Sequence, residues 1–275
     1  MTISTAPTGT ERIARAFARA RAERRLALVV YLTVGYPDKA ATGGLLRAAL
    51  DGGADVLELG VPFSDPLADG ATVQRASEIA LRQGVSLADC LAEATTIVRE
   101  RDAAVLLMGY ANPFLRYRGG LTGFASDAAR AGVAGIIVPD LPSEESAEFD
   151  AALDPEGLAR IDLYAPTTPD DRLARLVPAA RGFVYCVSLT GVTGARRALG
   201  ADVATFVARV RRHTALPIAV GFGISTAEHV RSLRGVADAV VVGSAALDAV
   251  SGAPADGRPE ALRAFVSTLA AAGKS

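Results

Sequence analysis

The sequence predicts a single α/β domain: a (β/α)8 TIM barrel with an additional N-terminal helix. Eight short apolar runs rich in β-branched residues recur along its 275 residues, with amphipathic helix-like segments between them. This alternation is typical of βα units on a parallel sheet, and eight such units close a barrel. A doubly wound open sheet would usually show fewer strands and a G-x-G-x-x-G turn after the first one. The first apolar run here ends instead in T-V-G-Y-P-D.

The first expected element is a helix in the arginine-rich segment 11–25, E-R-I-A-R-A-F-A-R-A-R-A-E-R-R. Ile13, Phe17 and Ala20 recur there at helical spacing, which favours a helix docked on the barrel. A transit peptide is the alternative interpretation. Two glutamates interrupt the segment, however, and transit peptides are poor in acidic residues.

The strands are expected at the apolar runs, which are Leu26–Leu32, Asp55–Leu59, Ala104–Met108, Gly135–Val138, Arg160–Tyr164, Phe183–Val187, Pro217–Val220 and Ala239–Val242. Segments rich in Ala, Arg and Leu predict helices between them, among them Thr42–Leu50, Leu87–Arg99, Leu121–Arg130, Asp170–Leu176, Val203–Arg212 and Ala227–Leu233. Nothing in mid-chain resembles a linker. We therefore expect residues 1–10 to form a flexible tail and residues 11–275 to form one barrel domain.

The composition excludes several classes of protein. Hydrophobic residues make up 50% of the chain and the net charge is −1, which argues against disorder and against nucleic acid as a partner. No apolar run approaches the roughly 18 residues of a membrane-spanning helix. The two cysteines, Cys90 and Cys186, form no C-x-x-C pair, so a reducing, cytoplasmic location is expected. No zinc motif, G-x-S-x-G or Walker A sequence is present, so we predict no metal site and no nucleophilic triad.

The second expected strand carries the main catalytic candidate. Side chains alternate along a strand, so Leu57 and Leu59 would pack on the helices while Glu58 faces the barrel mouth. Burying a carboxylate among apolar residues is costly and raises its pKa toward the range useful for proton transfer. The alternative is a structural glutamate paired with an arginine, but no inward-facing arginine is evident at the other strand ends. We therefore predict that Glu58 is a catalytic acid or base.

The loop after that strand, V-P-F-S-D-P-L-A-D-G (Val61–Gly70), is longer than the roughly 2–6 residues usual for a βα connection. It supplies two further carboxylates, Asp65 and Asp69. Asp69 precedes a glycine turn that could return its side chain over Glu58. A turn or capping role is the commoner explanation for a single loop aspartate. The position of the pair beside a strand-end glutamate favours a functional role.

Three glycine-containing turns after the sixth, seventh and eighth strands predict a phosphate site. Glycines let backbone N–H groups approach an anion, and a helix N-terminus adds a partial positive charge. Plain turn chemistry would explain any one of these turns, but three on the same rim favour a phosphorylated ligand. We expect Ser244 to cap the following helix and to donate its hydroxyl. The turn residues expected to bind the ligand are Thr193, Gly194, Gly223, Gly243 and Ser244.

Apolar and aromatic residues are expected around the same mouth. Alternation along the sixth strand turns Tyr185 inward, although core tyrosines are common and this residue alone decides little. Tyr31, Met108, Tyr110 and Phe222 lie at other strand ends. Together they suggest a flat, apolar ligand body beside the phosphate.

Six motifs, in this order and spacing, resemble the tryptophan synthase alpha chain family. They are E-L-G-V-P-F-S-D-P-L-A-D-G, M-G-Y-A-N-P, V-P-D-L-P, A-P-T-T-P, G-V-T-G and G-F-G-I-S. The resemblance extends from about Leu28 to the final helix, and the first motif is the most specific. It implies a (β/α)8 barrel and a carbon–carbon lyase. The implied reaction is the retro-aldol cleavage of indole-3-glycerol phosphate to indole and D-glyceraldehyde 3-phosphate.

The resemblance also implies residue roles. Glu58 would be the acid/base acting on indole C3 and on the glycerol hydroxyl. Asp69 would accept a hydrogen bond from the indole N–H and stabilise the positive charge that follows protonation at C3. Tyr185 would orient the catalytic carboxylate and the substrate. The positions that match the family's phosphate-binding residues are Gly194, Gly223, Gly243 and Ser244.

The family works with a beta chain that uses pyridoxal phosphate and receives indole through a tunnel, so the resemblance implies an alpha2beta2 heterotetramer. The alpha chain itself would need no cofactor, because protonated indole is its own electron sink. The expected contact face comprises the loop around Asp65, Asn112–Pro113 and Pro139–Pro142. We also expect segment Gly191–Gly200 to be mobile without a ligand.

Three alternatives stay open. The first is a stand-alone indole-releasing lyase without a beta partner, and the second is a non-catalytic barrel that only binds a phosphorylated ligand. The third is a Schiff-base aldolase, which needs a lysine on the inside of a strand. The chain has lysine only at Lys39 and Lys274, neither of which lies in an expected strand.

Overall fold

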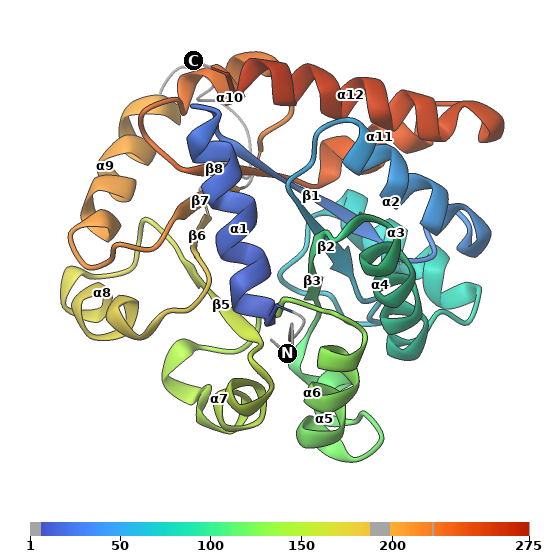
Figure 1. The fold of residues 1–275 in the computed structure, drawn as a ribbon, viewed down its shortest axis with the longest axis horizontal. Helices are drawn as coiled ribbons and strands as arrows, with labels where there is room; N and C mark the ends of the chain where they lie inside the picture. The colour runs from blue at the N-terminus through green and yellow to red at the C-terminus, as the bar shows by residue number, and fades with distance from the viewer. Residues whose placement is uncertain (1–6, 188–198, 222, 275) are drawn as a thin grey trace, which may run out of the picture.

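Eight parallel strands close into a barrel in which each strand pairs with its neighbours in chain order (Figure 1). The computed structural model describes residues 7–187, 199–221 and 223–274. The strands are β1 (Ala27–Thr33), β2 (Val56–Gly60), β3 (Ala104–Met108), β4 (Gly135–Ile137), β5 (Ala159–Tyr164), β6 (Val184–Val187), β7 (Ile218–Gly221) and β8 (Ala239–Val242). This architecture confirms the predicted barrel, and every strand end lies within one residue of its expected position.

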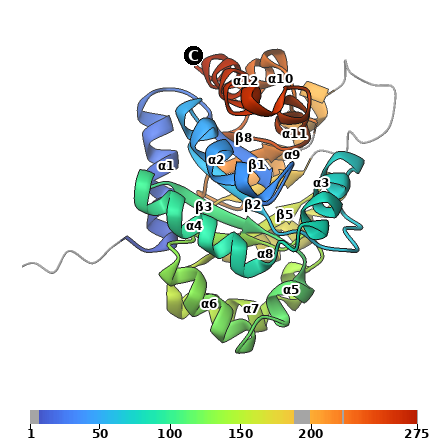
Figure 2. The ribbon, with the colours of Figure 1, turned by 90° about the vertical axis from the view of Figure 1, so that its right-hand side faces the viewer.

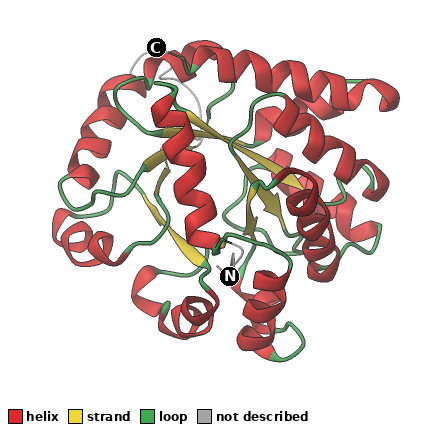
Figure 3. Ribbon diagram, in the orientation of Figure 1, coloured by secondary structure: helices red, strands yellow, loops and turns green. Residues whose placement is uncertain are grey.

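Helices surround the strands, as the red ribbons around the yellow barrel show in Figure 3. They are α1 (Gly9–Ala22), α2 (Thr42–Asp51), α3 (Ala71–Arg82), α4 (Leu87–Arg101), α5 (Ala111–Leu115), α6 (Gly120–Arg130), α7 (Ala147–Leu153), α8 (Asp170–Leu176), α9 (Leu199–Arg211), α10 (Ala227–Ser232), α11 (Ser244–Ser251) and α12 (Arg258–Ala272). Short 3-10 helices add η1 (Lys39–Ala41), η2 (Ser143–Glu145), η3 (Asp154–Glu156), η4 (Val177–Ala179) and η5 (Ala255–Gly257). None of the described helices is long and apolar enough to cross a membrane.

The start of α9 differs from its prediction by four residues, because the helix begins at Leu199 rather than at Val203. Gly200, the last residue of the segment 191–200 expected to be mobile, lies in the first turn of this helix, although glycine is a poor helix former. A first-turn position tolerates it more readily, because the first N–H groups of a helix have no intrahelical acceptor in any case.

The alternation of side chains divides the core into an inner and an outer part. Val56, Phe183 and Tyr185 belong to the cluster inside the barrel. Leu57 and Leu59 belong to the cluster between the strands and the helices. The predicted facing of β2 and β6 is therefore confirmed, and the inward face of β2 is the one that carries Glu58.

Helix α1 lies across the N-terminal end of the barrel, as Figure 1 shows, and forms the docked helix that the sequence predicts. A capping box between Thr8 and Glu11 begins the helix. Ile13 and Phe17 join the inner cluster, and the ring centroid of Phe17 lies 5.3 Å from that of Phe183. Because α1 covers this end, the opposite end carries the open mouth; Figure 2 shows α1 at one end of the barrel and α3 at the other.

Candidate active site

Glu58 occupies the inward face of β2, where it is paired in register with Tyr31 of β1 and Leu106 of β3. Its side chain is 1% exposed, and its Oε2 atom has no hydrogen-bond partner among the described residues. Burial, together with the negative charge of Asp69, raises the pKa of Glu58 to about 8. Among the described residues no arginine forms an ion pair with Glu58, so the structural ion-pair explanation finds no support there.

Asp69 returns from the long loop to the same cavity as Glu58. The Asp69 N–H donates to the carbonyl of Pro66 at 3.1 Å. The side-chain amide of Gln74 donates to the carbonyl of Asp69 at 2.9 Å, so the first turn of α3 holds the loop in place. Burial raises the pKa of Asp69 to about 6, and a hydrogen bond from Tyr110 partly opposes the rise.

Tyr110 contacts the loop Val61–Gly70 that carries Asp69. Its hydroxyl accepts a hydrogen bond from the Ala68 N–H at 2.8 Å, and its ring stacks on Phe63 with centroids 5.1 Å apart. It lies beside Asp69 but is not among the residues that line the cavity. Its position therefore points to a role in orienting Asp69 rather than in direct contact with a substrate.

Tyr185 and Tyr31 line the cavity from β6 and β1, and each lies over a glycine of the neighbouring strand. A Cβ atom built on Gly221 would lie 2.3 Å from the Tyr185 hydroxyl, and one built on Gly60 would lie 2.2 Å from the Tyr31 hydroxyl. Both glycines are therefore required for these ring positions. Tyr31 also shares a hydrogen bond of 3.0 Å with the hydroxyl of Thr33.

The rim after β7 and β8 brings Gly223, Gly243 and Ser244 to the same cavity. The expected capping role of Ser244 is wrong: Gly243 is the N-cap of α11 and Ser244 is the first helical residue. Gly243 lies one residue before the expected cap, and a Cβ on it would be in ordinary van der Waals contact with Tyr31 at 3.5 Å. Ser244 still begins the first turn, where backbone N–H groups lack intrahelical acceptors.

The cavity has a volume of about 280 Å³, close to the lower end of the range for small-molecule sites, roughly 300–1,000 Å³. It brings together eight of the predicted residues: Tyr31, Glu58, Asp69, Met108, Tyr185, Gly223, Gly243 and Ser244. Further lining residues, which the sequence did not single out, are Gly70, Val73, Ile224, Ser225, Val241, Ala245 and Asp248. Their closeness to the predicted motifs along the chain is the signal that could have found most of them.

Three predicted binding residues, Thr193, Gly194 and Phe222, lie outside the described residues. The same holds for positions 191–198 of the segment expected to be mobile. Within the described ranges, no group of three or more His, Cys, Asp or Glu side chains is arranged to hold a metal ion.

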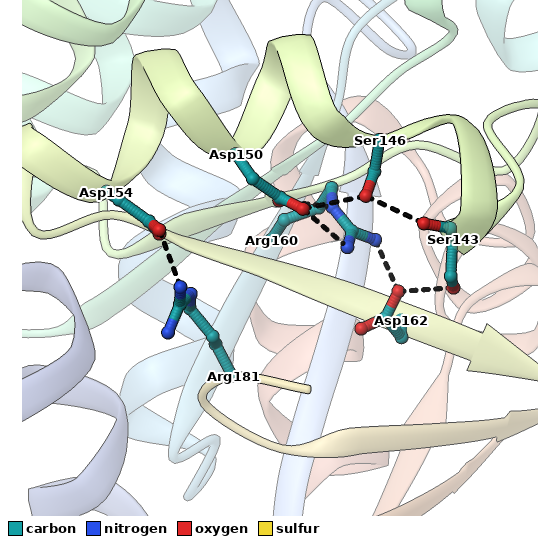
Figure 4. Close-up of polar contacts among 7 residues, drawn as sticks. All are labelled: Ser143, Ser146, Asp150, Asp154, Arg160, Asp162 and Arg181. Carbon is teal, nitrogen blue, oxygen red and sulfur yellow. Dashed lines mark hydrogen bonds and ion pairs between the residues drawn. The ribbon is translucent and has the colours of Figure 1, made fainter. Parts of the chain in front are cut away.

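The loop that follows β4 is fixed by polar contacts on both sides. Asp140 accepts a hydrogen bond from the Ala111 N–H at 2.9 Å, at the start of α5. On the other side, the Ser143 hydroxyl donates to Asp162 at 2.6 Å, and Arg160 pairs with Asp162 and with Asp150 of α7 (Figure 4). Because Arg160 and Asp162 lie on β5, the loop containing Pro139–Pro142 is tied directly to the barrel wall.

Comparisons with known proteins agree on one family. The family model described as tryptophan synthase alpha chain matches residues 17–272. The tryptophan synthase alpha chain of Roseiflexus castenholzii (strain DSM 13941 / HLO8) is 54% identical over 241 residues, covering 87% of this chain and 91% of that relative. The corresponding chain of Chloroflexus aggregans (strain MD-66 / DSM 9485) is 46% identical over 262 residues, covering 95% and 97%.

The fold is also similar to solved structures. A chain of Mycobacterium tuberculosis tryptophan synthase, solved in space group F222, superposes with a TM-score of 0.87 at 40% sequence identity. The superposition covers 96% of this chain and 98% of that one. The likeness therefore includes the whole barrel.

Proposed function

The chain belongs to the tryptophan synthase alpha chain family and is a carbon–carbon lyase, and we propose that the cavity between Glu58 and Ser244 is where it cleaves indole-3-glycerol phosphate. The observation that carries this proposal is a pair of carboxylates in one cavity, buried Glu58 and partly buried Asp69, with different pKa values of about 8 and about 6. Near pH 7 such a pair holds one proton on Glu58 and a negative charge on Asp69.

Cleavage of the carbon–carbon bond needs an electron sink, which protonation of the indole ring at C3 creates. Glu58, whose carboxyl is protonated near pH 7, donates that proton to C3. The ring nitrogen then carries positive charge, and Asp69 accepts the hydrogen bond of its N–H and stabilises that charge. Both steps use residues of this chain alone.

The resulting Glu58 carboxylate then removes the proton of the glycerol hydroxyl adjacent to the scissile bond. The electron pair of that O–H bond forms the aldehyde carbonyl, the carbon–carbon bond breaks, and its electron pair returns to the indole ring. Indole and glyceraldehyde 3-phosphate result, and Glu58 regains its proton, so the enzyme is ready for another cycle.

Tyr185 and the glycine-rich rim position the substrate. Tyr185 lies beside Glu58. Burial, and then the charge of Glu58, raise the pKa of the tyrosine. The phosphate is held by backbone N–H groups at Gly223, Gly243 and the first turn of α11, with Ser244 as a hydroxyl donor. Thr193, Gly194 and Phe222 complete the proposed binding site.

A beta chain is the proposed partner, in an alpha2beta2 assembly that receives indole, located in the cytoplasm; pyridoxal phosphate belongs to that partner. The similarity to a chain of M. tuberculosis tryptophan synthase supports this partner. The contact face comprises the loops around Asp65, Asn112–Pro113 and Pro139–Pro142. Leu67, which is 91% exposed on the first of these loops, supplies an apolar surface for it.

An assay of indole release from indole-3-glycerol phosphate, with and without added beta chain, tests both parts of the proposal. Release should rise substantially when the beta chain is added. A fast rate that the beta chain leaves unchanged would favour a stand-alone lyase. A folded protein that binds glycerol phosphate but releases no indole under either condition would favour a non-catalytic binding barrel.

A Schiff-base mechanism needs a lysine at the barrel mouth, and none of the described residues there is a lysine. Lys39 forms an ion pair of 2.7 Å with Asp89, and Lys274 forms an isolated bridge with Arg25 at the N-terminal end of β1. Mass spectrometry after borohydride treatment with substrate should therefore detect no covalent adduct. An adduct on either lysine would overturn the proposed mechanism.

A further inference from the structure

The N-terminal end of the barrel holds a second and larger cavity, of about 480 Å³. It lies between α1, the end of α4 and the residues that lead into β2 and β3. This end is opposite to the mouth that contains Glu58 (Figure 2). The chemistry proposed above does not use it.

Small residues and arginines together form the walls of this cavity. The space exists because the lining side chains nearest the barrel are small, namely Ala16, Gly53, Ala54, Ala103 and Ala104. Five arginines and three aspartates also line it. The lining therefore carries an excess of two positive charges.

Each of the three aspartates pairs with an arginine of the lining. These pairs show which arginines carry the excess positive charge. Asp102 pairs with Arg12, and Asp51 pairs with Arg101 at 3.1 Å. Asp55 is buried and accepts two hydrogen bonds from Arg25, at 2.5 and 2.8 Å.

Arg19 reaches Asp55 at 3.2 Å, but Asp55 also accepts the N–H of Leu28 at 2.9 Å. Arg15 forms no hydrogen bond or ion pair among the described residues, and its side chain is exposed toward the cavity. Among the described residues, Arg15 is thus the cation of this lining that forms no ion pair, and Arg19 shares Asp55 with Arg25. Arg15 and Arg19 stand four residues apart on one face of α1, where two like charges repel each other.

Two acidic residues at the ends of α1, Glu11 and Glu23, lie outside the cavity lining, although the charge of Glu11 interacts with that of Arg15. Glu11 accepts the backbone N–H of Thr8 at 2.7 Å within the capping box. Glu23 accepts a hydrogen bond from Arg25 at 2.6 Å.

We propose that this cavity is a binding site for a small doubly charged phosphate compound, held mainly by Arg15 and Arg19. Guanidinium groups bind phosphate oxygens with two parallel hydrogen bonds, and the bound anion would relieve the repulsion along α1. The cavity is concave and within the size range of small-molecule sites, so a small compound fits it better than the flat surface of a macromolecule.

Calorimetric titration of the full chain with inorganic pyrophosphate tests the proposal. No glycerol phosphate is added, because this doubly charged phosphate would compete for the cavity. We expect saturable binding that depends on Arg15 and Arg19, whereas any binding at the barrel mouth would not change with these two residues. Arg15→Gln and Arg19→Gln should each weaken binding about tenfold, or about 1.4 kcal/mol, because each variant loses a charged hydrogen-bond donor.

Arg175→Gln is the matched control, because it removes the same charge from an exposed position on α8 that does not line this cavity. It should bind pyrophosphate like the unaltered chain, and all three variants should keep the circular dichroism spectrum and the basal rate of indole release. The proposal fails if pyrophosphate shows no saturable binding. It fails equally if Arg175→Gln weakens binding as much as Arg15→Gln does, since the effect would then reflect overall charge.

Discussion

Carboxylates at the two ends of the barrel differ in their hydrogen-bond and ion-pair partners. At the N-terminal end, Asp55 is saturated by Arg25, Arg19 and a backbone N–H. At the mouth, Glu58 and Asp69 share a cavity in which none of the described lining residues is basic. A carboxylate with several donors links the elements that carry them, whereas an unpaired buried carboxyl such as Glu58 is driven toward its protonated form and can exchange a proton. Burial alone therefore does not distinguish a structural acidic residue from a catalytic one. The two are distinguished by the groups that pair with the carboxylate.

Replacing Glu58 with glutamine should give the largest effect. The variant keeps the shape of the side chain but cannot transfer a proton, so we expect indole release to fall about a thousandfold. Steady-state assays with the beta chain measure the loss, and circular dichroism checks the fold. Retained activity in Glu58→Gln would remove this residue from the mechanism.

The matching change at the opposite end is Asp55→Asn, which should act on stability. It removes the carboxylate of a buried ion pair and leaves Arg25, whose side chain is 11% exposed, with only Glu23 as its acidic partner. We expect the free energy of unfolding to fall by about 3 kcal/mol in urea titrations. Asp102→Asn is the control, because the carboxylate there is 70% exposed and its loss should cost less than about 1 kcal/mol. Equal effects would contradict the contrast between saturated and exposed pairs.

The pH dependence of kcat/KM should be bell-shaped. Activity requires Asp69 ionised and Glu58 protonated, so the limbs are expected near pH 6 and pH 8. Beyond each limb the rate should fall about tenfold per pH unit. In Asp69→Asn the acid limb should disappear and the residual rate should be lower. A flat profile between pH 5 and pH 9 would show that this pair does not control the reaction.

The smallest expected effect concerns stability at high pH. Because the folded chain raises the pKa of Glu58 above its usual value of about 4.5, the folded state prefers the protonated form. The stability present below pH 4.5 is therefore lost progressively as the pH rises to about 8. Glu58→Gln avoids this loss and should be more stable than the unaltered chain at pH 9, by roughly 1–3 kcal/mol, but not at pH 4. Urea titrations at the two pH values measure the difference, and an equal change at both would exclude ionisation as its cause.

The sequence predicts the barrel and the inward face of β2 well, because strand alternation is a local property. The apolar pattern of β2 alone predicts that Glu58 faces the inside of the barrel. The unusual length of the following loop indicates a functional role for Asp69. Tyr110 shows the limit of this approach. Its position at a strand end suggests a wall of the cavity, yet it lies behind the loop, since its hydroxyl accepts the Ala68 N–H.

Other features depend on contacts between distant segments. The cap of α11 lies at Gly243, one residue earlier than the hydroxyl of Ser244 suggests, and a helix boundary is not fixed to one residue by a local pattern. The excess charge at the N-terminal end likewise appears only when Arg15 and Arg19 are seen with the aspartates of other elements. The arginine-rich segment predicts the helix but not the cavity beside it.

The two glycines beneath Tyr31 and Tyr185 have a consequence for the evolution of ligand choice. A methyl group on Gly60 or Gly221 would displace the ring above it, although neither glycine is itself a cavity-lining residue. A displaced ring would change the shape of the cavity, because Tyr31 and Tyr185 both line it. A substitution at either glycine could thus alter which ligand fits while leaving both carboxylates in place.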